Sequence, residues 1–133
     1  MFEWQENMSV GIREIDSHHK RIIALINKLE ASLGKGEDQA ITAEILTEVS
    51  NYTIYHFFAE ESLMEKHGYP GYEQHKSEHL KLTGITFDFM GKLSGNKTSL
   101  GQELLDFLIN WLKDHILVTD MKYAPFFHDK GLT

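Results

Sequence analysis

Apolar residues recur along this chain at intervals of three and four, the spacing of one face of an α-helix. Clusters of helix-breaking residues interrupt the pattern around Gly34–Gly36, His67–Gly71 and Gly95–Thr98. No run of alternating apolar and polar residues, which a half-buried strand would need, lies between these clusters. The pattern therefore predicts four helices, over residues of about 16–34, 38–66, 70–93 and 99–118.

The residues near these limits are of types that commonly occur at helix ends. Asp16 is expected at the N-cap of the first helix, and Ser99-x-x-Gln102 has the form of a capping box for the fourth. Gly68 suits the position just after the second helix, and Pro70 suits the first turn of the third. The sequence thus indicates where each helix begins or ends as well as which face it buries.

Four helices joined by short loops pack as antiparallel neighbours. We therefore predict an all-α fold, an up-down-up-down antiparallel four-helix bundle with an N-terminal extended arm over residues 1–14. Phe2 and Trp4 of this arm are expected to lie across the bundle, and residues 121–133 are expected to form a C-terminal tail. A chain of 133 residues suffices for one sizeable core, so we expect a single domain over 1–133.

Several ionisable residues fall on the apolar stripes of the four helices, where side chains point inward. They are His19, His56, Glu60, His75, His79 and His115. The free-energy cost of burying six such groups without partners would exceed the net stability of a domain, which is about 5–15 kcal/mol. A metal ion removes this cost, because neutral imidazole and ionised carboxylate are its ligands. The positions predict a buried metal site assembled from all four helices.

The individual spacings in this set are weak signals. His75-x-x-x-His79 and His56-x-x-x-Glu60 each place two side chains on one helix face, but such pairs are equally typical of helix surfaces. All six residues lie on the inward-facing stripes of their helices, which favours a metal site over separate pairs at the surface. The remaining histidines lack this phase: we expect His18 at the surface or rim, His67 at a helix C-terminus and His128 in solvent.

Asp120 needs a separate argument, because it follows His115 by five residues. On a regular helix the two side chains would lie about 140° apart and could not meet at one metal. Asp120 can be a ligand only if the fourth helix widens into a π-type turn, or ends, between Ile116 and Asp120.

Composition narrows the classes of protein. Thirteen Lys and Arg against twenty Asp and Glu give a formal charge of -7, which disfavours nucleic acid and anionic membranes as partners. There is no cysteine, so disulfides, iron–sulfur clusters and thiolate zinc sites are excluded. The sequence offers neither a leader peptide nor an apolar run long enough for membrane insertion, so a cytoplasmic location is expected.

The ordered set of these motifs resembles the hemerythrin family, in particular its single-domain bacterial members, along most of the chain. The matching segments are Trp4, Ser9-Val-Gly-Ile12, Ile15-Asp16-x-x-His19-Lys20, His56-Phe-x-x-Glu60-Glu61-x-x-Met64, Gly68-Tyr-Pro70, His75-x-x-x-His79 and Trp111-Leu-x-x-His115-Ile-x-x-x-Asp120. His18 departs from the family, whose members commonly carry glutamine at this position.

The resemblance implies two iron ions per chain with a bridging oxo or hydroxo group. It assigns the ligands in three sets: His75, His79 and His115 on one iron, His19 and His56 on the other, and Glu60 and Asp120 bridging the two. The iron of His19 and His56 then has one coordination position open, where dioxygen is expected to bind. The resemblance also places an apolar oxygen pocket around that position, formed by Ile22, Phe57, Trp111, Leu112 and Ile116.

The function that the resemblance implies is reversible oxygen binding, for transport, storage or delivery to an unidentified oxygen-accepting protein, without enzymatic turnover. Three alternatives use the same di-iron centre: detoxification of nitric oxide or peroxide, sensing of oxygen or iron, and iron storage. A ferritin-like oxidase is disfavoured, because no Glu-x-x-His pair falls on the core positions. The His-Glu-x-x-His signature of zinc hydrolases is also absent.

Overall fold

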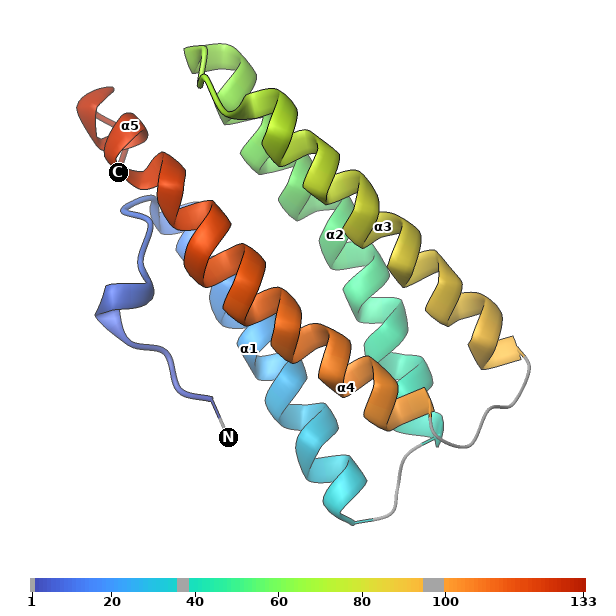
Figure 1. The fold of residues 1–133 in the computed structure, drawn as a ribbon. Helices are drawn as coiled ribbons and strands as arrows, with labels where there is room; N and C mark the ends of the chain where they lie inside the picture. Colours follow the sequence, from blue (N-terminus) through green and yellow to red (C-terminus); the bar gives the residue numbers. More distant parts are fainter. Residues whose placement is uncertain (1, 36–38, 95–99) are drawn as a thin grey trace.

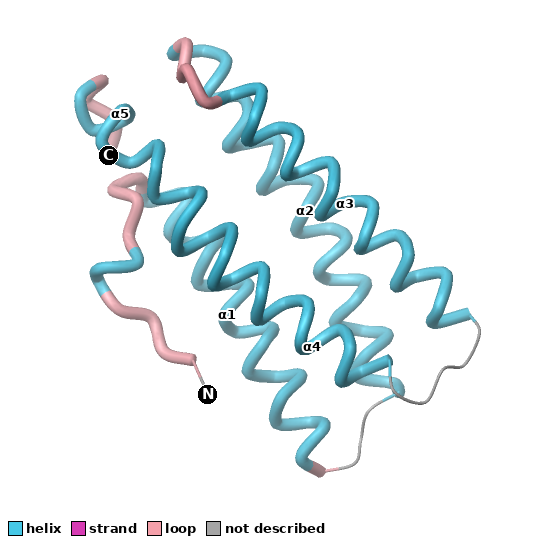
Figure 2. Tube along the Cα trace, in the orientation of Figure 1, coloured by secondary structure: helices cyan, strands magenta, loops and turns pink. Residues whose placement is uncertain are grey.

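A computed structural model describes residues 2–35, 39–94 and 100–133 of the chain. Within these ranges all regular structure is helical, which confirms the all-α prediction. The four long elements are α1 (Arg13–Gly34), α2 (Gln39–His67), α3 (Tyr72–Ser94) and α4 (Leu100–Asn110). They run alternately up and down, with α1 and α3 each beside both α2 and α4 (Figure 1). Figure 2 shows how little of the described chain lies outside helices.

The chain continues beyond α4 without leaving the bundle. A π-helix, η2 (Trp111–Thr119), follows directly, and then come a 3-10 turn, η3 (Asp120–Tyr123), and the short helix α5 (Ala124–Asp129). The structure thus differs from the expected tail over 121–133. Tyr123 and Phe127, four residues apart on one helix face, are both buried, and their packing accounts for the difference.

The N-terminal arm lies against the bundle as predicted. It contains one 3-10 turn, η1 (Glu6–Met8), and Phe2 and Trp4 pack on the core while the Asn27 side chain bonds the backbone of Phe2. The predicted N-cap at Asp16 is wrong, because α1 begins three residues earlier, after Ile12. The Asp16 carboxylate instead accepts hydrogen bonds from the Ser9 hydroxyl and the Val10 N–H, and so fixes the arm to α1.

The connection between α2 and α3 combines a helix cap and a turn. Gly68 has φ +69°, and the N–H groups of Gly68 and Tyr69 donate to Glu65 and Met64, as in a Schellman cap. Pro70 does not begin α3, contrary to prediction. It is the second residue of a turn closed by the Tyr72 N–H donating to Tyr69, a position that suits the fixed φ of proline. The capping residue proposed for α4, Ser99, lies outside the described residues.

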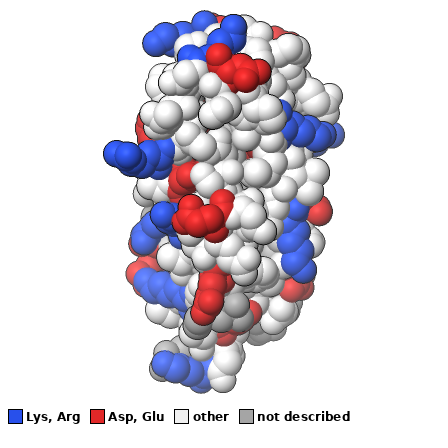
Figure 3. All heavy atoms as spheres, turned by 90° about the vertical axis from the view of Figure 1, so that its left-hand side faces the viewer, with Lys and Arg blue, Asp and Glu red and all other residues white. Residues whose placement is uncertain are grey.

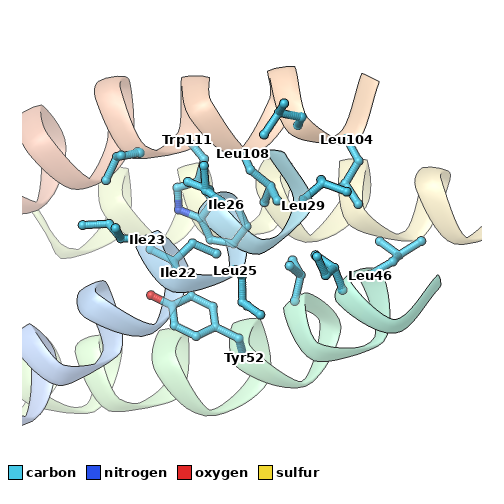
Figure 4. Close-up of a cluster of buried hydrophobic side chains, with 14 of the residues drawn as sticks. Ile22, Ile23, Leu25, Ile26, Leu29, Leu46, Tyr52, Leu104, Leu108 and Trp111 are labelled. Atoms are coloured by element: carbon cyan, nitrogen blue, oxygen red, sulfur yellow. The ribbon is translucent and has the colours of Figure 1, made fainter. Parts of the chain in front are cut away.

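Two apolar clusters fill the bundle. The larger one joins the C-terminal half of α1 to α2, α4 and η2, with Phe89 of α3, and Figure 4 shows side chains of this cluster meeting between helices. The smaller one lies at the other end and joins the arm to Met64, Tyr123 and Phe127. Between the clusters lie the polar residues that the sequence singled out, on α1, α2, α3 and the segment formed by η2 and η3. His19, for example, lies between Ile15 and Ile22 of α1.

None of the described helices is both long enough and apolar enough to cross a membrane. The face drawn in Figure 3 carries acidic and basic side chains intermixed. Among the residues described on that face, no continuous basic track for a phosphate backbone appears.

Candidate metal centre

The structure brings all seven predicted ligand side chains to one level of the bundle. The six that the helical phase placed inside come from α1, α2, α3 and η2, and every one of the seven is buried. The most exposed of them, His115, has only 5% of its surface accessible. The interior phase predicted for the histidines and for Glu60 is confirmed.

Asp120 reaches the same level through the widened end of the fourth helix. The Asp120 N–H donates to the carbonyl of His115, five residues earlier, which is the hydrogen-bond pattern of a π-helix. This widening places both side chains on one face, with His115 Nε2 3.1 Å from Asp120 Oδ1. The predicted π-type distortion is therefore confirmed, and it extends over the whole of Trp111–Thr119.

The potential ligand atoms form two overlapping groups, each with its atoms within 4.8 Å of one another. One contains His75, His79 and His115, the other His19 and His56, and both contain Glu60 and Asp120. The two carboxylates thus lie between a three-histidine side and a two-histidine side.

Each carboxylate faces both sides. Asp120 Oδ1 lies 2.8 Å from His75 Nε2, whereas Asp120 Oδ2 lies 3.1 Å from His19 Nε2. Glu60 Oε1 lies 3.1 Å from His56 Nε2 and 3.2 Å from His79 Nε2. A side chain that approaches nitrogens of both groups has the placement that a bridging ligand requires.

The converging atoms fit a metal better than they fit one another. Although these nitrogens and oxygens approach closely, all five histidine Nε2 atoms, both Asp120 oxygens and Glu60 Oε1 lack a hydrogen-bond partner. Buried polar atoms without partners are rare in folded proteins and call for an explanation. Coordination of a cation by neutral imidazoles and ionised carboxylates would satisfy all of them.

The charges of the centre favour ionised carboxylates. Burial by itself would raise the pKa of Glu60, but the His56 and His79 imidazoles hold that pKa well below its usual range. Burial and the neighbouring Glu60 would likewise raise the pKa of Asp120, yet His115 and His19 lower it. In the metal-free chain Asp120 in turn raises the pKa of His115 against the opposing effect of burial. Both carboxylates are therefore ready to bind a cation at neutral pH.

Comparison with known proteins agrees with this geometry. The family model described as "Hemerythrin HHE cation binding domain" matches residues 10–127. The chain belongs to the hemerythrin family. Its matched range includes all seven residues of the two ligand groups.

Hemerythrin-family relatives cover most of the chain. A bacteriohemerythrin of Pseudomonas aeruginosa (strain UCBPP-PA14) is 35% identical over 121 residues, which cover 91% of this chain and 78% of that protein. A bacteriohemerythrin of Clostridium acetobutylicum is 31% identical over 130 residues, 92% of this chain and 98% of the relative. The crystal structure of a hemerythrin carrying a single leucine-to-tyrosine substitution superposes with a TM-score of 0.84 at 28% identity, covering 94% of this chain and 95% of that one.

Three side chains outside the ligand set orient the imidazoles of this hemerythrin-family centre. Glu61 lies 2.8 Å from Nδ1 of His79, Glu78 lies 3.2 Å from Nδ1 of His115, and His18 Nδ1 lies 2.9 Å from Nδ1 of His56. Such contacts fix the ring and the tautomer of a metal-binding histidine. His18, expected at the surface or rim, has a side chain only 13% exposed and lies at the rim of the centre.

A further neighbour, Tyr123, was missed because it lies in the segment expected to be a tail. Its buried hydroxyl donates to Glu60 Oε2, and its ring lies 5.6 Å from that of His75. The spacing of Tyr123 and Phe127 was the available signal. Pro125 and the short length of α5 make that signal weak.

The five side chains expected around an oxygen pocket lie together in the larger apolar cluster beside the centre. These residues, Ile22, Phe57, Trp111, Leu112 and Ile116, are all buried. The Phe57 ring stacks on His79 with 3.8 Å between centroids and 6° between planes. This wall of the centre is therefore mainly apolar, and through Phe57 it lies against His79 of the three-histidine side.

Proposed function

We propose that this protein binds dioxygen reversibly at a carboxylate-bridged di-iron centre, as a carrier, store or supplier of oxygen rather than as an enzyme. The observation that carries the proposal is the pair of unequal ligand groups with two shared carboxylates. Two metal ions fit such a pair of groups, whereas one ion would leave part of the set without a partner.

Iron is the metal that we assign to the centre. The donors are imidazole nitrogens and carboxylate oxygens, which suit iron, and the chain contains no thiolate. The three-histidine side, His75, His79 and His115, would hold one ion and His19 with His56 the other. Glu60 and Asp120 would bridge them, together with a solvent-derived oxo or hydroxo group.

The inequality between the two sides supports binding of an external ligand. With both carboxylates shared, the side of His19 and His56 has one protein nitrogen fewer. The iron pair, when bound, would supply an open coordination position there and the electrons that dioxygen needs.

The surrounding residues favour reversible binding over turnover. Ile22, Leu112 and Ile116 close the centre with apolar groups, which would keep water and competing nucleophiles out. The contacts of Glu61 and Glu78 hold the histidines in fixed orientations, so ligand binding requires little reorganisation. Release of the same ligand is then the expected outcome.

The test is anaerobic reconstitution with ferrous iron, followed by admission of air and then by purging, with the visible spectrum recorded throughout. We expect two irons per chain and an absorption band that appears with oxygen and disappears on purging. The matched control is Asp120→Asn, which removes a shared carboxylate charge and should lose the band. Immediate and irreversible conversion to a ferric form would instead support a reactive or sensing role, and iron far from two per chain would contradict the di-iron assignment.

A further inference from the structure

Two buried polar atoms near the centre belong neither to the ligand set nor to its outer partners. In the described part of the chain, the hydroxyl of Tyr52 and the indole N–H of Trp111 have no hydrogen-bond partner. Tyr52 is 1% exposed and Trp111 2%, so water from the surface does not reach either side chain. Buried polar groups without hydrogen-bond partners lower the stability of the fold, so their presence in an apolar core requires an explanation.

Tyr52 lies against the two-histidine side, and Trp111 lies next to Tyr52. The Tyr52 ring stacks on His56, with 4.8 Å between centroids and 17° between planes, and its centroid is 6.1 Å from that of Trp111. In Figure 4 the phenol oxygen points away from Leu46, toward the end of the cluster at which Ile22 lies. His19 is three residues before Ile22 on α1, so the hydroxyl points toward the metal centre.

The chemistry of the two groups specifies what they can bind. The phenol of Tyr52 carries a donor hydrogen at neutral pH, as tyrosine ordinarily does. Indole nitrogen is a donor only. Phenylalanine would fill the same space as Tyr52 without an unsatisfied hydroxyl. The wall therefore presents hydrogen-bond donors where apolar packing alone would need none.

We infer that the Tyr52 hydroxyl, assisted by Trp111, donates a hydrogen bond to the far atom of a small ligand held at the His19 and His56 side. The ligand class is a diatomic molecule or a linear triatomic anion with a lone pair on the atom distant from the metal. Tyr52 thereby discriminates such ligands from single-atom anions, which have no second atom to reach it. This inference rests on the proposed di-iron centre.

The experiment compares Tyr52→Phe with wild type in anion titrations of the oxidised, iron-loaded protein. Azide is the triatomic probe and chloride the single-atom probe. Loss of one hydrogen bond should weaken azide binding about tenfold, while chloride binding stays the same. Tyr55→Phe is the matched control, because Tyr55 lies on the same helix with 45% of its surface exposed, and we expect it to change neither affinity.

A second readout is the urea midpoint of the metal-free protein. Tyr52→Phe should leave this midpoint unchanged or higher, because the variant removes a buried hydroxyl without a partner. Unchanged azide affinity in Tyr52→Phe would overturn the inference. A lower midpoint with unchanged azide affinity would show that the hydroxyl holds an ordered water only. Equal losses of azide and chloride affinity would show a packing role.

These results are separable from failure of the proposed function. If wild-type protein takes up two irons but Tyr52→Phe binds azide with unchanged affinity, only the role of Tyr52 is contradicted. Wild-type protein that does not take up two irons contradicts the di-iron centre, and with it this inference. Trp111→Phe gives an independent check, since it should also weaken azide more than chloride.

Discussion

The two sides of the metal centre share their carboxylates and differ in almost everything else. On the three-histidine side, His79 and His115 have carboxylate neighbours, Glu61 and Glu78, at their outer nitrogens. On the two-histidine side, the outer partner of His56 is another imidazole, that of His18. The outer nitrogen of His19 has no hydrogen-bond partner among the described residues.

This difference suggests that the two sides have different roles in the proposed metal centre. An imidazole that donates its outer N–H to a carboxylate is a more basic and better oriented metal ligand. In the proposed di-iron centre the three-histidine side would therefore have both more ligands and stronger ones, and it would suit a metal that stays fully coordinated. The two-histidine side would have fewer ligands, and it would suit a metal that takes up an external ligand.

The largest effect should come from deleting one imidazole on each side. His79→Ala and His56→Ala are matched, since each histidine lies 3.1–3.2 Å from the same Glu60 oxygen. We expect His56→Ala to retain about one iron per chain and His79→Ala to retain less, because its loss breaks the stronger group. Iron assay after desalting measures this, and equal losses would contradict the division between the sides.

Outer partners should have the next largest effect. Glu61→Gln and Glu78→Gln should each weaken metal binding at the three-histidine side by about 10–100-fold, the usual loss for such partners. His18→Gln replaces one uncharged partner by another and should have a smaller effect on the other side. Competition with a chelator gives the affinities, with the exposed Glu73→Gln on α3 as control. A greater loss in His18→Gln than in Glu61→Gln would reverse the comparison.

Tyr123→Phe tests a contact that serves both sides at once. Its hydroxyl donates to Glu60, a buried carboxylate shared by the two groups. Loss of this bond should destabilise the metal-free protein by about 1.5–3 kcal/mol, as measured by urea unfolding. The Tyr55→Phe control should unfold like wild type. Iron lost from only one side in Tyr123→Phe would show that Glu60 is not shared.

The smallest change expected is in the pH profile of metal-free stability. Because the pKa of Asp120 is lowered in the folded state, its carboxylate stabilises the fold at pH values above the ordinary pKa of an aspartate, about 3.9. This contribution falls as the pH drops below that value. The raised pKa of His115 contributes stability below about 6.5, and this is lost as the pH rises. Urea midpoints should thus be highest between about pH 4 and 6.5. Asp120→Asn should flatten the profile, and an unchanged profile would refute the pairing.

Helical periodicity predicted the buried position of most residues of the candidate centre. Candidate ligands that share the phase of apolar neighbours, such as His19 and Glu60, could be placed inside because a regular helix repeats its faces. Asp120 could not, since its position depends on hydrogen bonds that span five residues instead of four. Spacing alone also could not find Glu61 or Glu78, because their contacts depend on how neighbouring helices pack. The N-cap at Asp16 failed for a similar reason: a tertiary contact with Ser9 and Val10 used the carboxylate.

The most direct test of the central claim, two irons in unequal environments of which one accepts oxygen, is Mössbauer spectroscopy of the fully reduced protein loaded with isotopically enriched iron. We predict two quadrupole doublets of equal area, from the three-histidine and the two-histidine side. Oxygen should change the spectrum, and purging should restore both doublets. A single doublet, or a ferric spectrum that persists after purging, would contradict the account.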